Sequence, residues 1–316
     1  MSAFPALANA EAFQSWRANP ALWRSAVDEI LRGHALPSGA PEAFPTGTNL
    51  VVALDERVIL KVFPPFYRSQ FLSERASLQQ LHGRLEIAIP EILVEGEQDG
   101  WSYLAITRLE GVLGSVAWPL TSEYEKDAIL RQIGEAIAQV QRAPLGPLAD
   151  IEPRWPVFLA AQIAGCRARH ERLGLPPRYL QELEELLLEA PRILPTDFSP
   201  VVLTGEYIPE NFLLTPTPSG WRLSGLIDFG DVMTGWREYD LLGPSAFMAA
   251  GKPERVRALL GGFGYSQADM TPALAQRLMA LLLLHRASDP LRHIDIADWP
   301  AKAASLQDLQ RMLWPF

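Results

Sequence analysis

The chain has 316 residues, of which 48% are hydrophobic and 21% charged, with a net charge of −9 and one cysteine. This length favours two domains or one two-lobed domain, and the composition excludes disorder over most of the chain. An acidic chain lacks the basic face that nucleic-acid binding needs, but it suits a cationic substrate. The single cysteine, Cys166, excludes an intramolecular disulfide and a cysteine-based metal site.

The sequence shows neither a signal peptide for secretion nor a membrane-spanning segment. The first residues lack the basic and apolar segments of a signal peptide. The longest apolar run, 279–284, is far shorter than the roughly 20 residues that span a bilayer. We therefore expect a cytoplasmic protein without nucleic-acid or membrane partners, either a monomer or a homodimer.

The first third of the chain predicts two helices and then a group of strands. Helical spacing of apolar residues over 9–32 is broken at Asn19-Pro20, which separates the two helices. The following elements are predicted, in chain order, as strands 50–54 and 58–63, a helix over 69–83 with Ser69 as N-cap and Gly83 as stop, and strands 87–94 and 101–107, joined by a turn over 95–100.

Beyond Glu110-Gly111 the pattern becomes mainly helical. Residues 122–141 form an amphipathic helix, and further elements are predicted as helices 155–173 and 178–190, strands 201–203, 212–214 and 223–227, and helices from Tyr239 onward that are interrupted at 261–264 and 289–290. We therefore predict an α+β fold with a small strand-rich N-terminal lobe, residues 1–107, and a larger helix-rich C-terminal lobe, residues 108–316.

The segments LTGEYIPENFLL and LSGLIDFGDV carry the most chemical information. Glu206 precedes Asn211 by five residues, and Asp228 follows Asn211 by 17 at the end of a predicted strand. Phosphoryl transfer needs such a set: one carboxylate to orient the attacking hydroxyl, and an amide oxygen with a second carboxylate to hold Mg²⁺ against the phosphates. Two neighbouring loops could bring these side chains to one point.

This pair of segments resembles the catalytic and metal loops of the aminoglycoside phosphotransferase and choline-kinase family, whose members have a protein-kinase-like fold. The usual His-Gly-Asp, four residues and Asn appears here as Thr204-Gly205-Glu206, four residues and Asn211. The metal motif appears as Ile227-Asp228-Phe229, and a later element as Gly235, Tyr239, Asp240 and Leu241. The resemblance covers roughly residues 40–250, and helices 9–32 and 122–143 are loosely similar to hygromycin-B-type members.

A lone lysine, Lys61, interrupts the otherwise apolar strand 58–63, as an edge residue or as a phosphate ligand. The resemblance implies that it binds the nucleotide α- and β-phosphates and that Glu74, on the next helix, fixes its amine. It also implies a nucleotide-covering turn with Thr46, Gly47 and Thr48, and a nucleobase site on the backbone at Thr107 and Leu109. The expected cofactors are ATP or GTP, with Mg²⁺ held by Asn211 and Asp228.

Two positions depart from the family pattern. Thr204 stands where histidine is usual, and Glu206 stands at the position of the catalytic aspartate. The extra methylene moves the carboxylate by about 1 Å, a displacement that can cost on the order of 100-fold in rate. Activity with a shifted substrate and a catalytically silent protein both remain open.

The substrate is expected over the C-terminal lobe. Acidic residues there could attract the ammonium groups of an aminoglycoside, although the default interpretation of most of them is a solvated surface charge. These residues are Asp231, Glu238, Asp289, Asp295 and Asp298. Trp236 and Trp299 could line a sugar pocket or pack in the core. The five histidines show no metal-ligand spacing and are expected at the surface or in the core.

The resemblance implies an ATP- or GTP-dependent phosphotransferase that acts on a hydroxyl of a small molecule, such as an aminoglycoside antibiotic. In it, Glu206 would orient and deprotonate the hydroxyl. The alternative is a silent nucleotide-binding pseudokinase or scaffold of the same fold. A protein kinase is disfavoured because the chain after Tyr239 lacks an Ala-Pro-Glu element.

Overall fold

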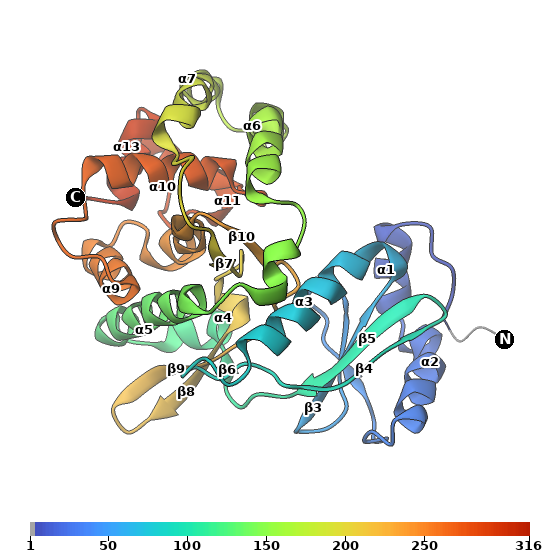
Figure 1. Ribbon diagram of the computed structural model, residues 1–316. Helices are drawn as coiled ribbons and strands as arrows, with labels where there is room; N and C mark the ends of the chain where they lie inside the picture. Colours follow the sequence, from blue (N-terminus) through green and yellow to red (C-terminus); the bar gives the residue numbers. More distant parts are fainter. Residues whose placement is uncertain (1–3) are drawn as a thin grey trace.

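The computed structural model describes residues 4–316 and has an α+β fold with a small antiparallel sheet and many helices (Figure 1). The sheet has five antiparallel strands in the order β1-β2-β3-β5-β4. Its strands are β1 (Glu42–Ala43), β2 (Leu50–Ala53), β3 (Val58–Phe63), β4 (Ile92–Gln98) and β5 (Trp101–Thr107).

Helices cover both faces of this sheet. Leu60 and Val62 pack in one hydrophobic cluster with α1 (Ala10–Arg17) and α2 (Pro20–Gly33). The alternate residues of β3, such as Phe63, pack with α3 (Arg68–Leu81) in the other cluster. Because side chains alternate along a strand, Lys61 points to the α3 side. Burial on both faces explains why β3 is apolar apart from this lysine.

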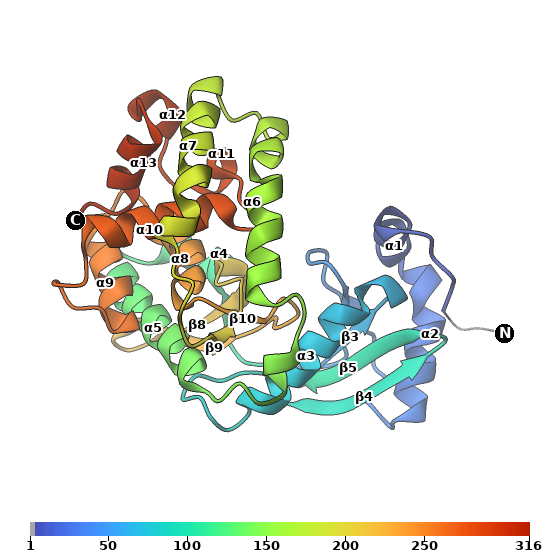
Figure 2. The ribbon, with the colours of Figure 1, turned by 45° about the horizontal axis from the view of Figure 1, so that its top comes forward.

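The rest of the chain is mainly helical (Figure 2). It carries two smaller sheets, with strand orders β6-β8-β9 and β10-β7 (Figure 1). Its elements are β6 (Val112–Leu113), α4 (Gly114–Ala117), α5 (Glu123–Arg142), α6 (Trp155–Arg172), α7 (Pro177–Ile193), β7 (Val201–Leu203), β8 (Phe212–Thr217), β9 (Gly220–Leu226), β10 (Met233–Gly235), α8 (Leu242–Pro244), α9 (Pro253–Phe263), α10 (Pro272–Leu284), α11 (Pro290–His293), α12 (Trp299–Lys302) and α13 (Leu306–Leu313).

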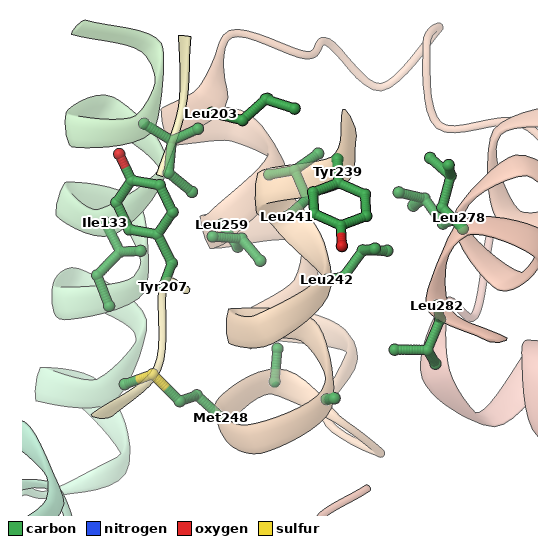
Figure 3. Packing of buried hydrophobic residues seen from close by; sticks show 14 of the residues in the cluster. Ile133, Leu203, Tyr207, Tyr239, Leu241, Leu242, Met248, Leu259, Leu278 and Leu282 are labelled. Carbon is green, nitrogen blue, oxygen red and sulfur yellow. The ribbon is translucent and has the colours of Figure 1, made fainter. Parts of the chain in front are cut away.

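A single hydrophobic cluster runs from Ile59 in the five-stranded sheet to Trp314 near the C-terminus. Within it, Tyr207, which belongs to the loop that follows β7, and Tyr239 pack among leucines (Figure 3). The loop that follows β7 therefore rests on the largest core of the protein. Because the cluster crosses residue 107, the division into lobes at that residue stays a prediction.

Three local predictions were wrong. The strand predicted at 87–94 is β4 at Ile92–Gln98, and the chain turns at Asp99-Gly100, where both φ angles are positive. This edge strand has exposed polar residues between half-buried ones, a pattern that suggested a turn. Helix α3 begins at Arg68 with Tyr67 as N-cap instead of Ser69.

A helix break was predicted over residues 261–264, but the helix is interrupted only at Gly264. Helix α9 continues through Gly261 and Gly262 and ends at Gly264, whose φ is 101°. A side chain at Gly262 would meet the backbone carbonyl of Arg131 at 2.0 Å, so the glycine allows α9 to approach α5 closely. Among residues 4–316, no helix combines the length and the apolar character that crossing a membrane requires.

Candidate active site

Lys61 joins the five-stranded sheet to the C-terminal part of the chain. Its Nζ lies 2.6 Å from Oε2 of Glu74 on α3 and 3.1 Å from Oδ1 of Asp228. Burial acts to lower the pKa of Lys61, but Asp228 and Glu74 outweigh it and hold that pKa above its usual value. The attraction of Lys61 lowers the pKa of Asp228. The predicted Lys61–Glu74 pair is thus formed, and Asp228 completes it.

The loop after β7 is held by a buried carboxylate. Asp240 accepts hydrogen bonds from the backbone N–H groups of Thr204 (3.1 Å) and Gly205 (2.9 Å). Burial raises the pKa of Asp240 to about 7. The side-chain amide of Asn211 donates to the backbone carbonyl of Glu206 at 3.0 Å. These bonds fix the loop at both ends of the segment that carries Glu206.

Three of the predicted catalytic groups surround one small cavity. Glu206, Asn211 and Asp228 all line a space of about 10 Å³, enough for a single water-sized species. The Nδ2 of Asn211 donates within the loop, which leaves its Oδ1 as an acceptor oxygen beside the cavity. Asp228 has a φ of 65°, a conformation uncommon outside glycine and enriched for aspartate and asparagine.

Glu206 faces one cation and one further carboxylate. Arg286 Nη2 lies 3.6 Å from Glu206 Oε1 and 3.2 Å from Asp231 Oδ1. Burial and the nearby Asp231 raise the pKa of Glu206 to about 7, while Arg286 acts to lower it. The glutamate that replaces the usual aspartate is therefore paired with an arginine from a distant part of the chain.

The residue before this arginine supports the same loop. His285 Nε2 lies 3.2 Å from the Gly205 carbonyl, and its ring stacks on Tyr239 with centroids 4.7 Å apart. Burial lowers the pKa of His285 to about 4, so the ring is neutral at pH 7. Its Nδ1 accepts from the N–H of Ala287, which assigns Nε2 as the donor to Gly205. His285 thus supports a loop in which Thr204 has replaced histidine.

Comparison of the sequence with known protein families identifies the family of this chain. A model of the phosphotransferase enzyme family matches residues 45–277, which include Lys61 and Glu74 as well as Glu206, Asn211 and Asp228. This chain belongs to the phosphotransferase enzyme family.

Solved structures show the same fold for this phosphotransferase-family protein at low identity. The GDP complex of wild-type aminoglycoside 2'-phosphotransferase-IIIa is 16% identical, with a TM-score of 0.67 over 92% of this chain and 98% of that one. Macrolide 2'-phosphotransferase MphH from Brachybacterium faecium is 18% identical, with a TM-score of 0.58 over 82% and 89%. Aminoglycoside phosphotransferase APH(3'')-Id from Streptomyces rimosus is 19% identical, with a TM-score of 0.58 over 83% and 98%.

In this family member, the predicted nucleotide-covering turn is anchored by α1. Arg17 donates to the backbone carbonyls of Asn49 (2.6 Å) and Pro45 (2.8 Å), and Gln14 donates to that of Thr48 at 3.2 Å. Thr46, Gly47 and Thr48 are exposed, and Gly47 has a φ of 95°. Helix α1 therefore holds the turn through the backbone carbonyls of the turn.

Residues 107–109, at the end of β5 and just after it, contain the backbone positions predicted to contact the nucleobase. The N–H of Thr107 donates to the Glu91 carbonyl at 2.9 Å, and the N–H of Arg108 donates to the Arg57 carbonyl at 2.7 Å. Both donors are therefore engaged within the protein. Of the two backbone positions predicted, Leu109 is the one left to offer an N–H to a nucleobase.

The predicted substrate carboxylates are dispersed. Asp231 lies at the site beside Arg286. Glu238 does not serve a substrate, because it is 1% exposed and is bound by Arg277 (3.0 Å) and Tyr265 (2.8 Å). Asp295 and Asp298 are exposed but do not line the pocket beside Glu206. Trp299 is buried and donates to the Pro290 carbonyl, which is the core role.

Sequence reasoning missed Arg286 and treated His285 as an ordinary histidine. Both follow directly after the apolar helix α10, and their partners lie about 80 residues earlier in the chain. The available signal was a His-Arg pair directly after the apolar last turns of α10.

Proposed function

We propose that this protein transfers the γ-phosphoryl group of ATP or GTP to a hydroxyl group of a small molecule. The observation that carries the proposal is the convergence of Lys61, Glu74 and Asp228 through contacts of 2.6 and 3.1 Å, with Glu206 and Asn211 on the cavity beside Asp228. Membership of the phosphotransferase enzyme family supports it, as do related structures that contain GDP or ATP.

Lys61 would bind the α- and β-phosphates, and Glu74 would keep its amine in place. The Oδ1 of Asn211 and the carboxylate of Asp228 are hard oxygen ligands on one cavity, as Mg²⁺ prefers, and phosphate oxygens commonly supply the other ligands. When bound there, Mg²⁺ would neutralise charge on the phosphates. The exposed turn at Thr46–Thr48 would cover the phosphates, and Leu109 would meet the nucleobase.

Glu206 would orient the acceptor hydroxyl and take its proton. The new bond joins the acceptor oxygen to the γ-phosphorus, and the bond to the β-phosphate oxygen breaks, so that a nucleoside diphosphate leaves. A carboxylate with a pKa of about 7 is closer to operating pH than an ordinary glutamate, which suits general-base catalysis.

A silent nucleotide-binding protein is the second candidate, and one observation favours it. Arg286 lies 3.6 Å from Glu206, so a part of this carboxylate is engaged by a cation instead of facing an acceptor alone. In a silent protein, Lys61 and Asp228 would still bind nucleotide, but Glu206 would only stabilise the loop.

Replacement of Glu206 separates the two candidates. We would measure nucleoside-diphosphate release with MgATP and MgGTP, with and without aminoglycosides, macrolides, sugars and amino alcohols. An active enzyme loses acceptor-dependent release in Glu206→Ala and keeps or raises it in Glu206→Asp. Release that is equal in wild type, Glu206→Ala and Asp228→Ala would contradict the proposed function.

A further inference from the structure

The pocket beside Glu206 is built mainly from apolar side chains. It has a volume of about 160 Å³ and lies between the loop after β7 and the segments around α8, α10 and α11. Its walls include Ile208, Leu242, Phe247, Leu282 and Ile294. The volume is close to that of the roughly 150 Å³ apolar cavity that holds one benzene molecule.

The polar side chains of this pocket are few, and Asp289 is its carboxylate besides Glu206. Asp289 lines it, but its Oδ1 caps α11 by accepting from the N–H of Arg292 at 3.3 Å. Two histidines also line it, and burial lowers the pKa of both His285 and His293, so that they are neutral at pH 7.

Arg286 already contacts the two carboxylates nearest to where the acceptor hydroxyl would lie. Arg286 Nη2 contacts Asp231 at 3.2 Å and Glu206 at 3.6 Å. An ammonium group that approached either carboxylate would meet this guanidinium. The other acidic candidate, Glu238, is bound by Arg277. Arg286 therefore reduces the attraction that an aminoglycoside would meet at Glu206 and Asp231.

We propose that the acceptor is an alcohol that carries an apolar group of about the size of one ring beside the reacting hydroxyl, and that polycationic aminosugars are not its substrates. This rests on the proposed function, since it is the acceptor of that reaction that fills the pocket. The apolar group lies against Phe247 and Leu282, and the hydroxyl points to Glu206.

The test is binding to the full-length protein with MgADP present, observed by saturation-transfer NMR. The probes are cyclohexylmethanol, which has one ring and one hydroxyl, glucose as a polar neutral control, and kanamycin as a polycation. Cyclohexylmethanol is expected to bind at least tenfold more tightly than glucose or kanamycin. Tighter binding of kanamycin by the wild-type protein would overturn the proposal, and this comparison needs no variant.

Two variants locate the site. Phe247→Asp places a carboxylate on the half-buried apolar wall and is expected to weaken cyclohexylmethanol binding at least tenfold. The matched control is Leu188→Asp on α7, where the side chain is 80% exposed, and it should change nothing. Arg286→Gln should strengthen kanamycin binding. Cyclohexylmethanol binding that is unchanged in Phe247→Asp would overturn the assignment of the pocket.

The nucleotide signal in the same samples tests the proposed function separately. A protein that binds no MgADP contradicts the phosphotransferase proposal itself. A protein that binds MgADP in wild type but not in Asp228→Ala, and that prefers kanamycin, contradicts only the assignment of the acceptor.

Discussion

Arg286 opposes the rise in the pKa of Glu206, the carboxylate that would act as base. We consider the variant Arg286→Gln, which removes the charge and keeps much of the side-chain length. In the wild-type protein, burial and Asp231 raise the pKa of Glu206 to about 7, and Arg286 opposes them from 3.6 Å. Loss of the guanidinium removes a stabiliser of the charged form, so the pKa must rise further.

The size of this pKa shift follows from the distance between Arg286 and Glu206 and from the exposure of the two side chains. Two unit charges about 4 Å apart interact by about 1 kcal/mol in water and by about 4 kcal/mol near a protein surface. Arg286 and Glu206 are 31% and 30% exposed, and solvent screens such pairs strongly. We therefore take about 1.4 kcal/mol, which corresponds to about one pKa unit.

The assay is a pH titration of the glutamate side-chain carboxyl carbons by ¹³C NMR, with Glu206→Gln to assign the resonance. In Arg286→Gln the midpoint of Glu206 should move upward by about one pH unit, while Arg286→Lys should keep it near the wild-type value. Arg311→Gln, on an arginine that is 64% exposed in α13, is the matched control. A midpoint that stays unchanged or moves downward in Arg286→Gln would refute this reasoning.

Three further predictions concern stability and nucleotide binding. Glu74→Ala leaves buried Lys61 with only Asp228 as a charged partner and should lower the free energy of unfolding, measured in urea, by about 3 kcal/mol. The double variant Lys61→Met/Glu74→Met should regain part of this stability without regaining nucleotide binding. Asp240→Asn should cost about 1–3 kcal/mol, because the N–H groups of Thr204 and Gly205 bind different carboxylate oxygens and asparagine places an NH2 donor at one of these two positions. Unchanged urea unfolding would contradict this prediction. Gly134→Ala on α5 would place its Cβ 2.2 Å from the Leu259 carbonyl and should cost about 1–3 kcal/mol by thermal unfolding, whereas Gly165→Ala, with nothing within 4 Å, should be neutral or stabilising.

Sequence patterns predicted the elements whose signals are local. Strand β3 was predicted with its observed bounds because both of its faces are buried and its residues are continuously apolar. The edge strand β4 was displaced in the prediction because Glu95 and Glu97 face solvent on it. Edge strands bury less apolar surface, so their pattern is weaker than that of a central strand.

The residues of the site also divide into those that the sequence predicted and those that only the structure shows. Asn211 and Asp228 were predicted from the spacing of two short motifs, and Lys61 and Glu74 from the family resemblance that those motifs support. The pairing of Arg286 with Glu206 joins segments 80 residues apart, and no local spacing encodes it. The acidic residues predicted for the substrate were chosen by charge alone. Glu238 failed because its partner Arg277 comes from a different helix.

The most direct test of the central claim is acceptor-dependent release of nucleoside diphosphate by the wild-type protein, with Glu206→Ala and Asp228→Ala as blanks. We predict release with MgATP or MgGTP that requires an acceptor with an apolar ring and a hydroxyl, and that both replacements abolish. A protein that binds Mg-nucleotide but gives the same release in wild type and in both blanks, with every acceptor, would contradict the account.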